Sequence, residues 1–223
     1  MAKAGDIAPH LQRAARATLA PLGCTQVGRS RTWIADQGFW TIIIEFQPSS
    51  FAALPNSIQK DIPIHLNVGA NWLWYPKAFP SFDYSHRVLS TSYGLDEPSM
   101  IETANHFAVR AAEQVAVLRR TFPSISDIAR RLIPDERAAR WGIYHAAIAN
   151  GLAGNTFLAQ QYFDQLQETP AAHEWEHALL LRSRALAAQL FSPADFRTAV
   201  TAIVMESRTL QNLPTRPTDL ELA

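Results

Sequence analysis

The chain has 223 residues, 48% of them hydrophobic and 18% charged, which is enough to bury a core without a metal or a disulfide. Twenty basic residues balance twenty acidic ones, so the formal net charge is zero, which excludes the global positive field that attracts nucleic acid or anionic lipid. The single cysteine, Cys24, excludes an internal disulfide, and no apolar run reaches the roughly 18 residues that span a bilayer. Because the N-terminal stretch lacks the apolar run of a signal peptide, we expect a cytoplasmic protein. From the balanced charge and the lack of a long apolar run, we expect no nucleic-acid or membrane partner.

The first elements in the chain are a helix and two strands. Apolar residues recur at helical spacing over residues 6–22, and Gly23 follows where a left-handed C-terminal cap is favoured. After Gly23 the apolar residues recur at every second position instead of at helical spacing. Residues 26–35 and 39–46 are therefore predicted to form two antiparallel strands joined by a turn.

The clearest alternation in the chain lies in residues 61–74. Apolar side chains occupy one face of this segment, whereas His65, Asn67 and Asn71 share the other. Residues 86–93 predict a further strand. Alternation of this kind is typical of an antiparallel sheet with one packed face and one solvated face. We therefore expect an antiparallel sheet of three to four strands that helices cover on one face.

From Asp96 to the end of the chain the period is helical. Pro98 stands where the first turn of a long helix favours proline, and later prolines separate four or five shorter helices. The fold class predicted from these patterns is α+β, with an N-terminal helix, the antiparallel sheet and an all-α tail of helical hairpins. We place the α+β domain at residues 1–122 and the helical-hairpin region at residues 123–223.

Several short motifs in the N-terminal half belong together. Residues Gly23, Thr32, Trp33, Gln47, Ser49 and the stretch 66–69 fit the pattern L-x-x-L-G-F, G-x-T-W, Q-x-S and N-L-G. On these residues, the segment from about residue 10 to residue 95 resembles the DUF4304 family, although Cys24 stands where that family has phenylalanine. The resemblance implies an α+β fold of helix, antiparallel sheet and helix. It implies no reaction and no catalytic residues, because the family is functionally uncharacterised.

The helical tail resembles a tetratricopeptide helix pair. Trp141 and Tyr144 stand early in residues 140–170, Ala159 stands in the second helix, and Pro170 closes the unit. A second unit follows, although it lacks the glycine and tyrosine positions of the repeat. Stacked helix pairs commonly present an extended surface to a protein partner.

The pentapeptide 173–177, HEWEH, contains the H-E-x-x-H signature of zinc peptidases. Such a site needs two imidazoles one helical turn apart, a glutamate that takes a proton from water, and a third protein ligand. His173 and His177 meet the spacing requirement, and Glu174 stands in the position of the general base. A zinc-dependent hydrolase that uses these three residues is therefore one hypothesis.

Other features of the same segment favour a surface helix. Pro170 places His173 in the first turn or two of its helix, and Trp175 projects from the side opposite to the histidines. Glu176 puts a charge between the glutamate and the second histidine, which is unusual in zinc sites. We therefore interpret HEWEH as a surface helix and predict no metal and no cofactor, with zinc as the alternative.

The solvated face of the sheet is the main candidate binding surface. Hydrogen-bonding groups on a rigid sheet suit an anionic small ligand or an acidic loop of a partner, although a solvated sheet face is polar in any case. The candidate residues are His65, Asn67, Asn71, Arg29, Arg31 and Arg87. We predict a non-catalytic binding module with a protein partner, in an accessory or immunity-type role in a bacterial gene cluster. A small ligand and a zinc hydrolase are the alternatives.

Overall fold

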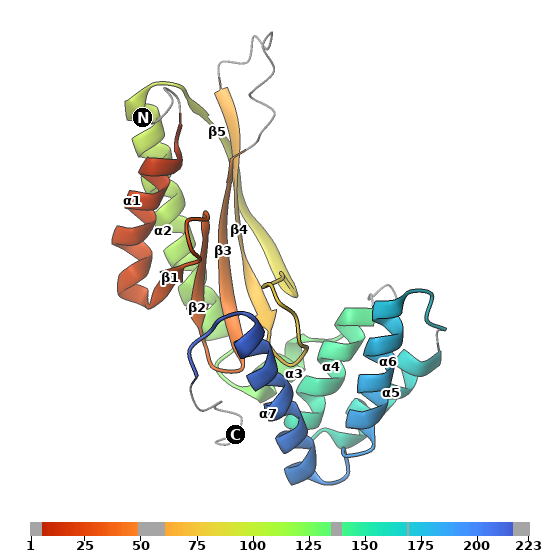
Figure 1. Ribbon diagram of the computed structural model, residues 1–223. Helices are drawn as coiled ribbons and strands as arrows, with labels where there is room; N and C mark the ends of the chain where they lie inside the picture. The colour runs from red at the N-terminus through yellow and green to blue at the C-terminus, as the bar shows by residue number, and fades with distance from the viewer. Residues whose placement is uncertain (1–5, 49–60, 135–139, 169, 216–223) are drawn as a thin grey trace. The chain divides into compact units, whose positions relative to one another are not determined.

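The computed structural model describes residues 6–48, 61–134, 140–168 and 170–215 (Figure 1). Ser49, one of the residues that carry the resemblance to the DUF4304 family, lies outside these ranges. The chain divides into two compact units. The first, which we call the sheet unit, comprises Met1–Gln37, Thr41–Asn71 and Tyr84–Arg119. The second, the helical unit, comprises Gly38–Trp40, Trp72–Asp83 and Arg120–Ala223.

The α+β fold class predicted from the sequence is confirmed. Five strands form one sheet in the order β1-β2-β3-β4-β5, and the pairs β1–β2, β2–β3 and β4–β5 are antiparallel. Helices α1 and α2 lie on the same side of this sheet (Figure 1). In chain order the elements are α1 (Ala8–Leu19), the short 3-10 helix η1 (Ala20–Leu22), β1 (Cys24–Gln26), β2 (Thr32–Asp36), β3 (Trp40–Pro48), β4 (Asp61–Trp72), β5 (Tyr84–Gly94) and α2 (Glu97–Thr121).

Alternating residues of the strands make the core face of the sheet. In the β2–β3 pair, Trp33 lies opposite Ile44 and Ala35 opposite Ile42, and all four are buried. β4 continues this face with Ile64, Leu66, Val68 and Ala70, each exposed by 2% or less. Burial of alternate apolar side chains favours this register, because a shift by one residue would turn the whole set towards the other face.

The sheet has five strands instead of the expected three to four. The single strand predicted over residues 26–35 is divided by a turn into β1 and β2. Gly28 has a positive φ of 55°, which residues other than glycine rarely adopt. The N–H of Ser30 donates to the carbonyl of Val27 at 3.0 Å, and this bond closes the turn. The burial pattern changes phase across this turn, because Cys24 of β1 and Trp33 and Ala35 of β2 are all buried, which one continuous strand would not allow.

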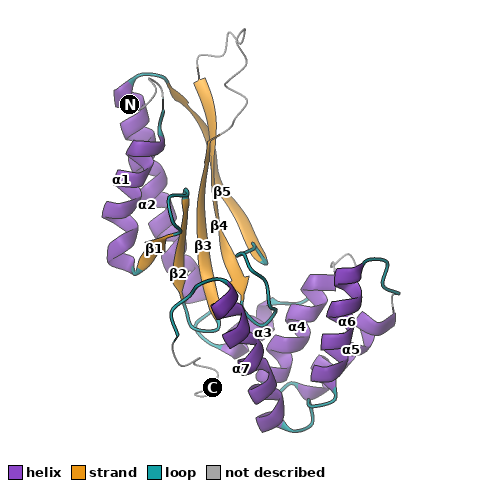
Figure 2. Cartoon of the chain, in the orientation of Figure 1, coloured by secondary structure: helices purple, strands orange, loops and turns teal. Residues whose placement is uncertain are grey.

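The described residues of the helical unit form helices α3 to α7 (Figure 2), and the pairs α4–α5, α5–α6 and α4–α7 are in contact. Gly151 of α4 faces α7: a Cβ atom at this position would lie 2.6 Å from the ring of Phe196, so a larger residue would force this buried ring to shift. Among the described residues, no helix combines the length and the apolar character needed to cross a lipid bilayer. The helices are α3 (Ile125–Arg131), α4 (Arg140–Leu152), α5 (Thr156–Glu168), α6 (Glu174–Ala187) and α7 (Pro193–Leu210).

The segment 72–83 packs against the helices of its own unit. The hydroxyl of Tyr144 donates to the carbonyl of Trp74 at 2.9 Å, and the hydroxyl of Ser207 donates to the carbonyl of Tyr75 at 2.9 Å. The rings of Trp72 and Trp74 stack with their centroids 5.1 Å apart, and both are fully buried. The segment 72–83 is therefore anchored to α4 and α7 by side-chain hydrogen bonds to its backbone.

Candidate functional site

The second glutamate of HEWEH caps helix α6. Glu176 Oε2 accepts hydrogen bonds from the backbone N–H groups of Ala172, at 2.6 Å, and His173, at 2.9 Å. Its other carboxylate oxygen lies 3.0 Å from Nε of Arg140, in α4. The backbone bonds, the first of them from Ala172, and the charge of Arg140 hold the pKa of Glu176 below its usual range. The negative charge of Glu176, which is unusual at this position of a zinc site, is thus explained by its role as a helix cap.

Only one of the two histidines of HEWEH lies within helix α6. His173 is the N-cap residue, with extended backbone angles of φ −124° and ψ 155°, and α6 begins only at Glu174. His177 lies in the helix, and both histidine side chains are exposed. Trp175 stacks on Trp141 of α4 with ring centroids 5.4 Å apart. Within the described residues, no group of three His, Cys, Asp or Glu side chains is placed to hold a metal ion. The geometry favours the surface-helix interpretation.

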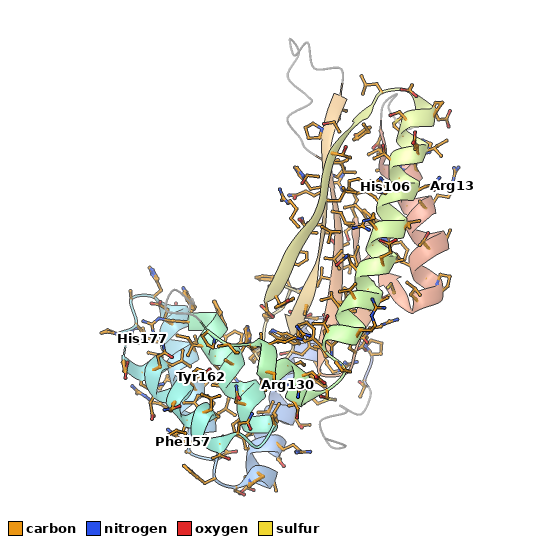
Figure 3. The ribbon with its side chains drawn as sticks, turned by 180° about the vertical axis from the view of Figure 1, so that it is seen from behind. Arg13, His106, Arg130, Phe157, Tyr162 and His177 are labelled. Carbon is orange, nitrogen blue, oxygen red and sulfur yellow. The ribbon has the colours of Figure 1, made fainter. Side chains whose placement is uncertain are left out.

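We expect protein purified without a histidine tag to contain well below one zinc per chain, because His173 precedes the first residue of α6 and the described residues place no third ligand beside the pair. Elemental mass spectrometry before and after treatment with a chelator measures this content. His177→Ala is expected to leave both the zinc content and Tm unchanged. His106→Ala, at an exposed histidine of α2, is the matched control (Figure 3). One zinc per chain that His177→Ala removes and His106→Ala retains would contradict this expectation and favour the hydrolase hypothesis.

The predicted polar side chains of β4 and β5 form a connected network on the sheet unit. Asn67 Nδ2 donates to Glu45 Oε2 at 3.0 Å and to Gln47 Oε1 at 3.3 Å. Arg87 Nε donates to Asn67 Oδ1 at 3.2 Å. Beside this network, His65 Nδ1 lies 3.0 Å from the hydroxyl of Ser90. We call this surface the polar strip; its members are Glu45, Gln47, His65, Asn67, Arg87 and Ser90.

Asn71, the third predicted residue of β4, does not belong to the polar strip. It is fully buried, and its Nδ2 donates to the hydroxyl of Thr41 at 3.0 Å. Ile34 and Ile43, on the same face of the sheet, are also buried. The expectation that this face is solvated along its whole length is therefore wrong at the Asn71 end, where Asn71 serves a buried contact instead of the surface.

The two remaining candidates, Arg29 and Arg31, lie together in and next to the β1–β2 turn. Both side chains are exposed, and their guanidinium groups make no hydrogen bond or ion pair with any described residue. They line a pocket of about 390 Å³ together with Ser30, Glu45 and Gln47. Since Glu45 and Gln47 also belong to the polar strip, the arginine pair and the strip form one continuous polar surface.

Sequence reasoning missed a polar cluster in the helical unit. Lys77 Nζ lies 2.6 Å from Asp83 Oδ2 and 2.5 Å from the hydroxyl of Ser81. The Ser81 hydroxyl donates to Asp83 Oδ1 at 2.7 Å, and the backbone N–H of Trp72 donates to Asp83 Oδ2 at 2.7 Å. Burial lowers the pKa of Lys77, and the charge of Asp83 opposes this effect. The carboxylate thus ties both ends of the segment 72–83 together.

His145 of α4 completes this cluster. Its Nδ1 accepts a hydrogen bond from the indole Nε1 of Trp74 at 2.9 Å, so the proton of the neutral ring is on Nε2. Nε2 lies 3.8 Å from Asp83 Oδ1, too far for a hydrogen bond. Desolvation in this fully buried position lowers the pKa of His145 to about 4, although Asp83 opposes the shift. No local motif marks the cluster, because His145 and Asp83 are far apart in the sequence.

Comparison of the chain with protein-family models, with curated proteins and with solved structures found no match. The resemblance to the DUF4304 family therefore stays a prediction, and function has to be argued from the residues.

Proposed function

We propose that this protein is a non-catalytic binding module that recognises an acidic segment of a protein partner. The recognition surface comprises the arginine pair, Arg29 and Arg31, and the neighbouring polar strip. One observation carries the proposal: two exposed guanidinium groups beside a pocket make no hydrogen bond or ion pair within the described residues. Guanidinium groups bind carboxylates through paired, charge-assisted hydrogen bonds, so a carboxylate is the partner group that satisfies them.

The polar strip supports the same function because its side chains are already ordered. Asn67 uses both its amide nitrogen and its oxygen within the strip, which fixes Glu45, Gln47 and Arg87 around it. A surface that is ordered before binding loses less side-chain entropy when the partner arrives. The exposed faces of these groups, carried by three neighbouring strands, therefore favour a specific contact over a diffuse charge effect.

The strip offers little support for catalysis. The contact between His65 and Ser90 has the spacing of a nucleophile and its base. Ser90 is exposed, however, and within the described residues no acidic group orients the imidazole of His65. Nucleophilic catalysis on serine needs such an orienting group and a site that excludes water. Binding without chemistry suits an accessory or immunity-type role, in which occupation of the partner's surface is the activity.

A photo-crosslinking amino acid in place of Gln47 tests this proposal, because Gln47 is exposed and lines the arginine pocket. In cells of the source organism, we expect a discrete crosslinked protein whose crosslinked peptide is rich in Asp and Glu. The double variant Arg29→Gln/Arg31→Gln should reduce the crosslink at least tenfold, since two charge-assisted contacts are lost. Mass spectrometry of the crosslinked peptide provides the measurement.

The charge-matched control is Arg13→Gln/Arg16→Gln, which changes two exposed arginines of α1; Figure 3 labels Arg13. It removes the same charge from the same unit and should leave the crosslink intact. Equal loss in both double variants would show a diffuse charge effect and overturn the proposed site. A crosslinked peptide without acidic residues would also overturn the proposed site.

A further inference from the structure

The β1–β2 turn borders a second, smaller pocket of about 150 Å³ in the sheet unit. Its floor is apolar and consists of Leu11, Trp33 and Phe46, each exposed by 3% or less. Arg29 and Arg31 line its rim, and they also line the larger pocket beside the polar strip. An apolar floor beneath a few polar groups is the usual composition of a site for a small organic ligand.

The charges at the rim select a monoanion. Among the described residues that line this pocket, Arg29 and Arg31 are cations and Asp6 is the one acid. The Asp6 carboxylate is held in place by the backbone N–H of Ala8, which donates to Oδ1 at 3.0 Å. Two cations and one anion leave a single positive charge. A carboxylate matches this charge, whereas a phosphate dianion would leave an excess of negative charge close to Asp6.

The turn that carries the arginines is rigidly hydrogen-bonded. The hydroxyl of Ser30 donates to the carbonyl of Val27 at 2.7 Å, and Nε2 of Gln26 donates to the carbonyl of Ser30 at 2.7 Å. The backbone positions of Arg29 and Arg31 are therefore fixed on both sides of Ser30. Since the fold already holds these positions, a ligand has to order only the two arginine side chains.

The volume of the pocket limits the apolar part of the ligand. A cavity of about 150 Å³ is large enough for a benzene-sized group, whereas one water molecule takes up roughly 30 Å³. We infer that this pocket binds a monocarboxylate with a short apolar body, of about four to six carbon atoms. Two kinds of ligand have this chemistry: a free branched-chain carboxylic acid, and the C-terminal carboxylate of a polypeptide whose last side chain is apolar. The inference deepens the proposed function and rests on it for the role of the arginine pair.

Titration of the ¹⁵N-labelled full chain with 4-methylpentanoate, followed by NMR, tests the inference. We expect shifts of the Trp33 indole N–H and of the turn amides, with a Kd of about 1 mM, as befits a ligand of this size. The neutral 4-methylpentanamide should bind at least tenfold more weakly, because it lacks the charge. Acetate should also bind at least tenfold more weakly, because it leaves the apolar floor empty.

Protein variants locate the same site. Arg29→Gln/Arg31→Gln should weaken 4-methylpentanoate binding at least tenfold, and Arg13→Gln/Arg16→Gln should not change it. A tetrapeptide that ends in leucine identifies the source: tighter binding than 4-methylpentanoate indicates a chain terminus, and weaker binding indicates a free acid. Equal binding of the acid and its amide, or shifts that survive loss of the arginine pair, would overturn the inference.

The outcomes also separate this inference from the proposed function. If no acid binds but the crosslink at Gln47 still depends on Arg29 and Arg31, the pocket inference fails and the binding module stands. If 4-methylpentanoate binds in the expected way but no crosslinked protein is found at Gln47, the proposed protein partner fails and the pocket stands.

Discussion

Asp83→Ala is expected to destabilise the helical unit by about 3–5 kcal/mol. The carboxylate is 10% exposed and accepts hydrogen bonds from Lys77, Ser81 and the backbone of Trp72. Its removal leaves the Lys77 ammonium group, 13% exposed, without a counter-charge in a largely dehydrated site. An uncompensated buried charge costs more free energy than the pair contributes, so the loss exceeds the value of one hydrogen bond.

Urea unfolding followed by tryptophan fluorescence measures this effect. Five of the six tryptophans, at positions 40, 72, 74, 141 and 175, belong to the helical unit, so the signal mainly reports that unit. A loss of about 4 kcal/mol in the free energy of unfolding lowers the urea concentration at half unfolding by about 2 M, when that free energy falls by about 2 kcal/mol per molar urea. The control is Glu113→Ala, which breaks the exposed Arg110–Glu113 pair and should cost less than about 1 kcal/mol.

A double variant shows whether the buried cation causes the loss. Lys77→Met/Asp83→Ala removes both charges, and we expect it to be more stable than Asp83→Ala alone. If the double variant is less stable than Asp83→Ala, the ammonium group is not the source of the instability. In that case the lost hydrogen bonds to the segment 72–83 would carry the effect.

Features of the fold that depend on near neighbours in the chain were predictable from the sequence. Gly23 has a φ of 75° at the end of η1, as its position after the apolar helix indicates. β4 covers Asp61–Trp72, almost the whole segment with the clearest alternation. The Val27–Arg31 turn was missed, although Gly28 stands between two runs whose buried positions differ in phase: Cys24 in β1, and Trp33 and Ala35 in β2. A local pattern identifies a cap or a strand, but it does not fix where a strand pair begins.

The candidate site was predictable only in part, and for a different reason. Asn67 and Arg87 were expected on one polar face, and strand register does place them in contact. Asn71 has the same alternation as Asn67 but is buried, because burial depends on what covers each end of the sheet. The contact between Asp83 and His145 joins residues from distant parts of the chain, so no sequence spacing predicts it. Long-range packing, and not residue type, decides these cases.

The stability of the helical unit is expected to fall by about 2 kcal/mol between pH 7 and pH 5 because of His145. Burial lowers the pKa of this imidazole from 6.5 to about 4, with Asp83 raising it and Lys77 lowering it as smaller effects. The unfolded state therefore binds a proton between these two pKa values that the folded state does not bind. Stability decreases as the pH falls below about 6.5 and stops responding to this group near pH 4.

His145→Gln isolates this contribution, because a glutamine oxygen can still accept the bond from the Trp74 indole. We expect the variant to be less stable at pH 7 but to lose about 2 kcal/mol less than the original chain between pH 7 and pH 5. Glu176, whose pKa is lowered, contributes stability that is lost only as the pH falls below its ordinary value of about 4.5, outside this range. Urea midpoints of both proteins at pH 7, 6 and 5 give the comparison. Parallel pH profiles would show that His145 titrates in the folded protein as it does in water, and that its side chain is not dehydrated.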